Sequence, residues 1–241
     1  MINDNRFPES FAFDSKTYRF IVLSPQIEDG IDEPTRSSKI SPAVIDAMIQ
    51  HAVNTYRIDI GRIYLCGMSM GGGAILDYLG SSPVAARRIA AAAIACPAAD
   101  LSVTEADVLG STGVPLVVTH NIADELVYYS RTVASMANLE RELDHPAARP
   151  IIIPFAVPSP DVYKHDSWTR SFEHLVPGSS VDPNLVNTLG TNVYEWLLKS
   201  STISAAPLPV TWNNFGLRKS SYGVLLEWSV SNQVNVGSYN I

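Results

Sequence analysis

The sequence has few cysteines, no long apolar run and no cluster of basic residues. Cys66 and Cys96 each lie in an apolar run typical of a buried strand, which excludes a metal site built on them and favours buried free thiols over a disulfide. No run approaches the roughly 18 apolar residues that a membrane span requires. A net charge of −7 without a basic stripe argues against nucleic acid and anionic membranes as partners.

A secretory signal is also missing from the start of the chain. The first ten residues, MINDNRFPES, have neither the charged start nor the apolar core of such a signal, so we expect any export signal to lie upstream. The 241 residues are 46% hydrophobic and 17% charged, which is an ordinary globular composition. They suffice for one sizeable core and a small appendage.

Short apolar runs alternate with helical patterns over residues 1–199. The expected strands are RFIVLS (19–24), RIYLC (62–66), Ile89–Cys96, PLVVT (115–119) and III (151–153). The expected helices begin at Ser41 and Pro42, run over 71–79 and about 129–143, and begin again at Asp182 and Pro183, the last one continuing to Leu197. The alternation predicts an α/β fold with a doubly wound, mostly parallel sheet.

The composition changes after Lys199. Residues 200–209, SSTISAAPLP, are typical of a linker, and apolar and polar residues then alternate over 226–230 as in a β-strand. The segment 210–241 has only about 30 residues, too few for a complete sandwich. We therefore predict an α/β domain over 1–199, a linker and a partial β-sandwich module.

The stretch CGMSMGGGA (66–74) places Ser69 in a Gly-x-Ser-x-Gly match. Three fixed positions of this kind recur by chance roughly 0.08 times in a chain of this length, so the flanks must decide. The match joins an expected strand to an expected helix, which is the context of a nucleophile elbow, and Gly67 and Gly71 would let the two elements pass closely. The signatures of phosphate and dinucleotide loops are missing. We predict that Ser69 is a nucleophile, the alternative being a glycine-rich helix start without chemistry.

A nucleophilic serine needs a histidine to take its proton and usually a carboxylate to orient that histidine. The segment THNIADELV follows the PLVVT strand and places Asp124 in the loop just beyond it. Asp124 is therefore the predicted acid, and Asp100, after the preceding strand, is the reserve. Glu125 is expected to point elsewhere. The alternative role for Asp124 is a helix N-cap.

Five histidines compete for the role of the base. They are His51, His120, His145, His165 and His174. The first lies inside a helix, the second precedes the acid in the same turn, and the third lies in a polar helix end. His165, in VYKHDSWTRSF, lies in the loop between the III strand and the last helix, from which a base can reach Ser69. His174 follows nine residues later, so we predict His165.

These segments together resemble a known family. GMSMGG after YRIDIGRIYLCG, HNIADELV, and KHDSWTRSF followed by VYEWLL are similar to the polyhydroxybutyrate-depolymerase, feruloyl-esterase and dienelactone-hydrolase branch of the α/β-hydrolases, over about Phe20–Leu198. By position, the resemblance implies a nucleophile at Ser69, an acid at Asp124, a base at His165, one oxyanion donor in the backbone N–H of Met70, and a substrate-binding aromatic at Trp168. It implies no cofactor and no metal.

One feature of the family is missing. The second oxyanion donor of the family comes from a His-Gly loop after an early strand, and no His-Gly precedes Gly67. We expect either that the N-terminus is truncated and the first strands are lost, or that another group supplies the donor. The tail, PLPVTWNN to VGSYN (207–240), resembles the start of a β-sandwich module found behind secreted bacterial enzymes, which implies a secreted or periplasmic protein.

The leading functional hypothesis is a serine esterase acting on small or polymer-derived carboxylic esters by an acyl-enzyme mechanism. A peptidase related to prolyl oligopeptidase is the first alternative, because the same elbow and triad cleave amides. Comparing the rates of hydrolysis of p-nitrophenyl acetate and of a prolyl anilide separates the esterase from the peptidase. The second alternative is a non-catalytic carbohydrate- or surface-binding protein that has lost its oxyanion loop, which a fluorophosphonate probe would not label at Ser69.

Overall fold

A computed structural model describes residues 10–25, 31–32, 37–38, 40–141, 150–156, 163–172, 183–202, 211–220 and 223–231. The chain divides into two compact units, Met1–Thr202 and Ile203–Ile241. Within the part of the chain that the structure describes, no helix is long and apolar enough to cross a membrane.

The centre of the first unit is a four-stranded parallel sheet with the strand order β5-β6-β7-β8. Its strands are β5 (Tyr64–Met68), β6 (Ala91–Ala95), β7 (Leu116–Asn121) and β8 (Ile151–Phe155). Every residue of β6 and β7 is buried, because these strands have a neighbour on each side and helices over each face. The strands expected near 62–66, 89–96, 115–119 and 151–153 are thus confirmed with small changes of boundary.

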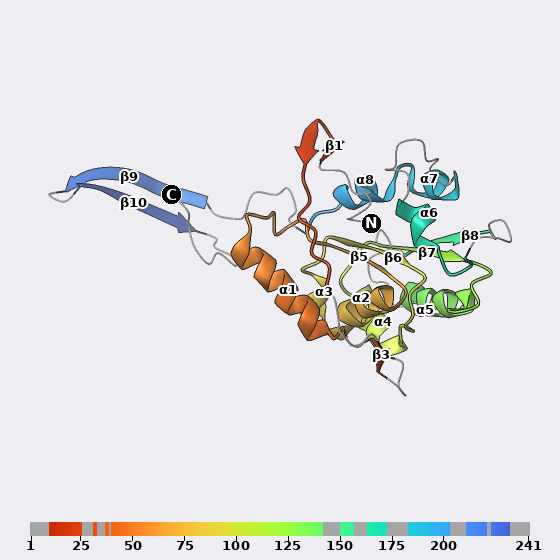
Figure 1. Ribbon diagram of the computed structural model, residues 1–241. Coiled ribbons are helices and arrows are strands. Elements are labelled where there is room, and N and C mark those ends of the chain that lie inside the picture. The colour runs from red at the N-terminus through yellow and green to blue at the C-terminus, as the bar shows by residue number, and fades with distance from the viewer. Residues whose placement is uncertain are drawn as a thin grey trace. The chain divides into compact units, whose positions relative to one another are not determined.

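Helices cover both faces of this sheet (Figure 1). One face carries α1 (Pro42–Thr55), α2 (Met70–Ser81), α3 (Pro83–Ala86), α4 (Val103–Gly110) and α5 (Tyr129–Arg141). The opposite face carries α6 (Trp168–Phe172), α7 (Pro183–Leu189) and α8 (Val193–Leu198). Parallel strands require such crossover connections. The predicted doubly wound α/β architecture is therefore confirmed.

The helix expected from Asp182 to Leu197 is instead two helices, α7 and α8. Gly190 has a φ of +68°, a left-handed conformation that ends an α-helix. Asn192 then caps α8, its side chain accepting a hydrogen bond of 2.8 Å from the Glu195 N–H. Apolar residues continue at helical spacing across this break, which is why the sequence pattern alone does not reveal it.

The strand expected over residues 19–24 is wrong. These residues have no regular structure, and Ile21, Val22 and Leu23 are 50%, 43% and 36% exposed. A strand must share its backbone hydrogen bonds with a neighbour, and no described strand pairs with this segment. The expectation that Cys66 is buried is also wrong: Cys66 is exposed, because β5 lies at an edge of the described sheet. Cys96 is buried as expected, and both thiols are free.

Two short antiparallel hairpins precede α1. The first joins β1 (Phe11–Phe13) to β2 (Lys16–Tyr18), and the second joins β3 (Ile31–Asp32) to β4 (Ser37–Ser38). The ring of Phe11 packs against Tyr194 of α8, with ring centroids 5.1 Å apart. The first hairpin therefore adds to the hydrophobic cluster on the α6–α8 face.

The second unit contains an antiparallel hairpin of β9 (Thr211–Ser220) and β10 (Gly223–Ser231). Its register shifts between Ser229 and Val230, as at a β-bulge. The alternating pattern at 226–230 thus lies in a strand, as expected. The linker and the partial sandwich stay predictions.

Candidate active site

Ser69 lies in the sharp turn between β5 and α2. Its φ of 51° and ψ of −119° are a strained conformation for a residue with a side chain. The turn is held by the Ser69 N–H, which donates to the Ala95 carbonyl at 3.0 Å, and by the Ser69 carbonyl, which accepts from the N–H groups of Gly73 and Ala98 at 2.9 Å each. These bonds tie the turn to α2 and to the end of β6.

The two glycines that flank Ser69 differ in whether the structure leaves space for a side chain. A Cβ on Gly67 would lie 2.7 Å from the carbonyl carbon and oxygen of Gly71 and 2.8 Å from Cδ1 of Ile75. A Cβ on Gly71 would meet nothing within 4 Å. The expected steric need for glycine is therefore confirmed at Gly67 and wrong at Gly71, because the backbone of Gly71 is the surface that Gly67 approaches.

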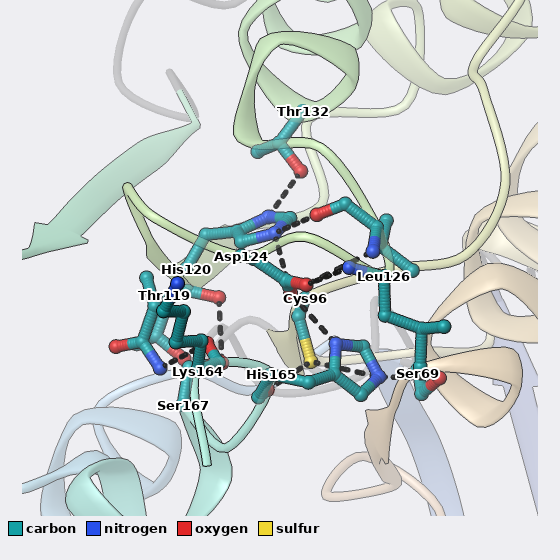
Figure 2. Close-up of polar contacts among 12 residues, drawn as sticks. Ser69, Cys96, Thr119, His120, Asp124, Leu126, Thr132, Lys164, His165 and Ser167 are labelled. Atoms are coloured by element: carbon teal, nitrogen blue, oxygen red, sulfur yellow. Dashed lines mark hydrogen bonds and ion pairs between the residues drawn. The ribbon is translucent and has the colours of Figure 1, made fainter. Parts of the chain in front are cut away.

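The structure brings the three predicted residues into one hydrogen-bonded series (Figure 2). Nε2 of His165 lies 2.9 Å from Oγ of Ser69, although the two residues are 96 positions apart. Nδ1 of His165 lies 2.6 Å from Oδ2 of Asp124. Ser69 follows β5, Asp124 follows β7 and His165 follows β8. They meet because the carboxyl ends of parallel strands lie at one edge of a sheet.

The carboxylate of Asp124 is buried and has a donor on each oxygen. Oδ1 accepts hydrogen bonds of 2.9 Å from the backbone N–H groups of Leu126 and Val127. Oδ2 faces His165. Asp124 therefore stabilises the turn that follows it, well before α5 begins at Tyr129, and it orients His165 with its other oxygen.

The competing residues lie elsewhere. Asp100 forms an ion pair with Arg131 at 2.8 Å, and Glu125 pairs with Lys164; both carboxylates are exposed. His51 is exposed on α1. His145 and His174 lie outside the described residues.

His120, which we did not predict to be the base, is in direct contact with the site. Its Nε2 lies 2.9 Å from the carbonyl oxygen of Val127 and 3.2 Å from Oδ2 of Asp124. Its Nδ1 lies 2.8 Å from Oγ1 of Thr132 on α5. The imidazole is fully buried, and burial lowers the pKa of His120, so its neutral form is favoured. The signal in the sequence was its position four residues before the predicted acid.

Cys96 is a second contact that the sequence did not indicate. It follows β6 with a φ of 38°, and its thiol donates to the His165 carbonyl oxygen at 3.4 Å and lies 4.0 Å from Nε2. Burial raises the pKa of Cys96 to about 11, so the thiol is protonated at neutral pH. Among the described residues, potential metal-ligand atoms of Cys96, Asp124 and His165 lie within 4.8 Å of one another. The Asp124–His165 hydrogen bond accounts for part of this closeness.

The loop that carries His165 is held by β7 and flanked by aromatic rings. Nδ2 of Asn121 donates to the Lys164 carbonyl at 2.8 Å. The rings of Tyr163 and Trp168 both meet the imidazole edge-on, with centroids 5.9 Å and 5.5 Å away. The structure thus places Trp168 beside the predicted base, and it adds Tyr163, which is 61% exposed.

Met70 begins α2 directly after Ser69. The first N–H groups of a helix have no acceptor within the helix. The Met70 N–H therefore lies at the helix N-terminus, directly after Ser69 in the chain.

Two hollows lie beside the site. One has a volume of about 380 Å³ and is lined by Glu125, Leu126, Tyr163, Lys164 and His165. The other has a volume of about 410 Å³ and is lined by Ile122, Asp124, Tyr128, Tyr129, Ser130 and Val133. Both linings contain apolar and aromatic side chains, and the hollow beside the imidazole also contains the ion pair of Glu125 and Lys164.

Comparison with solved structures identifies the fold. A thermostable esterase is similar with a TM-score of 0.50 and 20% identity, over 66% of this chain and 36% of that chain. The fold is α/β-hydrolase-like. This chain spans about a third of that esterase's length. A putative carboxylesterase from Lactobacillus plantarum WCFS1 is 18% identical, with a TM-score of 0.37, over 55% of this chain and 59% of that chain. The sequence matches no protein-family model and no curated protein.

Proposed function

We propose that the protein is a serine hydrolase that cleaves carboxylic esters through an acyl-enzyme. The observation that carries the proposal is the hydrogen-bonded series from Oγ of Ser69 through the imidazole of His165 to the carboxylate of Asp124. The strained backbone of Ser69 and the esterase-like fold support it. No metal or organic cofactor takes part in the proposed reaction.

The proposed chemistry begins with attack of Ser69 Oγ on the ester carbonyl carbon. The hydroxyl proton passes to Nε2 of His165, and Asp124 stabilises the resulting imidazolium through its bond to Nδ1. The tetrahedral intermediate collapses, and the alcohol leaves with the proton from Nε2. Water then attacks the acyl-enzyme and gives one proton to Nε2. That proton returns to Ser69 Oγ as the carboxylic acid is released.

Developing negative charge on the carbonyl oxygen needs a donor close to Ser69. We assign this role to the Met70 N–H, because it lies at the helix N-terminus directly after the nucleophile. We assign no second donor among the described residues. In acyl-transfer enzymes the loss of one such donor costs about 2.7–4 kcal/mol of transition-state stabilisation.

We place the substrate where Ser69 and His165 meet. The hollow of about 380 Å³ next to the imidazole presents Leu126 and Tyr163, which suit an apolar part of the ester. The ring of Trp168 meets the imidazole of the base edge-on, and we propose that it also contacts substrate. These features fit a small ester or the end of a longer one.

The test is hydrolysis of p-nitrophenyl acetate by the wild type and two variants. Ser69→Ala and His165→Ala are each expected to lower kcat by a factor on the order of 10⁴ or more, because the members of a triad act as a unit. His51→Ala is the matched control, because His51 is exposed on α1, and it is expected to keep wild-type activity. Retention of a tenth of the activity by Ser69→Ala would remove Ser69 from the mechanism.

A fluorophosphonate probe gives an independent readout. The wild type is expected to be labelled at Ser69 and Ser69→Ala to stay unlabelled, as judged by mass spectrometry. A wild type that neither hydrolyses the ester nor takes the label would contradict the proposal. Faster cleavage of a prolyl anilide than of the ester would instead indicate a peptidase.

A further inference from the structure

One oxygen of Asp124 is shared by two histidines. Oδ2 lies 2.6 Å from Nδ1 of His165 and 3.2 Å from Nε2 of His120. All three side chains are buried. The dashed lines in Figure 2 continue from Ser69 through His165 and Asp124 to His120 and Thr132. The hydrogen-bonded series is thus longer than a triad.

The surroundings of His120 determine where its proton lies. Nε2 faces two acceptors, the carbonyl oxygen of Val127 at 2.9 Å and the carboxylate of Asp124. This nitrogen must therefore carry a hydrogen and donate it. Nδ1 lies 2.8 Å from the hydroxyl of Thr132, which can donate to it. The two sides together select the neutral tautomer with the hydrogen on Nε2.

The titratable groups that face His120 come from three elements. They are Asp124 in the loop after β7, His165 in the loop after β8, and the phenol ring of Tyr129 on α5, whose centroid is 5.6 Å away. Asp124 favours a charged His120, and His165 opposes it. Burial outweighs the attraction and lowers the pKa of His120, so the neutral form of the imidazole is favoured.

We propose that His120 is a positioning residue that holds Oδ2 of Asp124 toward His165 and limits the negative charge that this oxygen offers to the imidazole. The proposal rests on the esterase function proposed above. A donor on Oδ2 stabilises the carboxylate. Without it, Asp124 would stabilise the protonated imidazole of His165 more strongly, and the base would lose its neutral form at a higher pH.

A purely structural role is the competing explanation. His120 also joins the turn at Val127 to α5 through Thr132, so its loss would loosen the loop that carries Asp124. Looser packing would lower stability and activity but would not move the pH at which activity begins. The position of the acidic limb of the pH–rate profile therefore separates the two roles.

The experiment compares His120→Leu with His120→Gln in ester hydrolysis. Leucine removes the donor, and we expect kcat/KM to fall roughly 10- to 100-fold, as for the loss of a hydrogen bond to a charged group. The acidic limb should move to higher pH, because a carboxylate without this donor favours a protonated neighbour. Glutamine can place an amide N–H where Nε2 lies, and we expect it to restore the limb to its wild-type position.

Two results would overturn the proposal. One is a His120→Leu enzyme that folds and keeps the wild-type acidic limb, and the other is an equal shift in both variants. Thermal unfolding of each variant accompanies the rates, so that a loss of folded protein is seen directly.

Nitrogen-15 NMR of the histidine-labelled wild type tests the protonation of His120 on which the proposal rests, and it needs a variant only to assign the signal. We expect His120, assigned by the signal that is lost in His120→Gln, to be neutral with its hydrogen on Nε2 at pH 7 and above, because burial lowers its pKa. Protonation in this range, or a hydrogen on Nδ1, would refute the proposal. Failure of the esterase function would show separately, as a wild type without ester hydrolysis whose His120 still has the expected NMR signature.

Discussion

Replacing Gly67 with alanine tests whether the elbow depends on close contact between strand and helix. The new Cβ would lie 2.7 Å from two backbone atoms of Gly71, and neither can move without moving α2. Overpacking of this kind costs about 1–3 kcal/mol. For a domain of 150–250 residues that corresponds to a fall in Tm of about 2–12 °C.

The same substitution should also impair catalysis. Relief of the contact shifts Ser69, which lies between the two glycines, and a displacement of about 1 Å can lower the rate roughly 100-fold. We expect kcat/KM for p-nitrophenyl acetate to fall by about this factor in the enzyme that stays folded. Circular dichroism during heating gives Tm, and a fluorophosphonate titration gives the number of active sites.

Gly71→Ala is the matched control. Its Cβ would meet nothing within 4 Å, and the residue lies in the first turn of α2. Alanine in a helix is favoured over glycine by up to about 1 kcal/mol, so we expect equal or higher stability and nearly unchanged activity. Wild-type Tm and rate for Gly67→Ala, or equal damage from both substitutions, would refute the reasoning.

Three further predictions concern the acid, the buried histidine and the tail. Asp124→Asn is expected to lower kcat about 10⁴-fold, because an amide does not hold His165 in the required tautomer. A loss below tenfold in steady-state assays would exclude Asp124 as the acid. The pKa of His120 is lowered in the folded protein, so the unfolded state binds more protons below about pH 6.5, and the free energy of unfolding falls as pH falls. Urea unfolding at pH 7 and pH 5 should show a smaller fall for His120→Gln, and an equal fall would contradict the lowered pKa. Cutting the chain after Ser204 should change Tm by less than about 5 °C, because both hydrophobic clusters lie within the first unit. A larger drop corresponds to more than about 1 kcal/mol and would show that the tail stabilises the core.

Local patterns in the sequence were enough for the fold class and for the turn that joins a strand to a helix at Ser69. A strand that is buried on both faces is a continuous apolar run, and this pattern can be recognised from neighbouring residues alone, as AAAIA in β6 shows. The elbow needs a glycine, a serine and a change from strand to helix within a few residues. Such features are encoded side by side along the chain, and they were readable there.

Edges and breaks were not readable in this way. Residues 19–24 have the composition of a strand but no described partner, and Cys66 has the neighbours of a buried residue but lies on an edge strand. Whether an apolar run is buried depends on what lies beside it. The helix break at Gly190 likewise depends on a left-handed backbone conformation that apolar spacing does not reveal.

The site shows the same division between local and distant information. The position of Asp124 after one strand and of His165 after another followed from chain order, because loops at the carboxyl ends of parallel strands share one edge. The distances between their atoms, the contact of Cys96 with His165 and the sharing of Asp124 by His120 depend on the packing of β6, β7, β8 and α5. Sequence motifs name the residues that can react, whereas the hydrogen bonds that orient those residues join segments far apart in the chain and exist only once the sheet and its helices are packed.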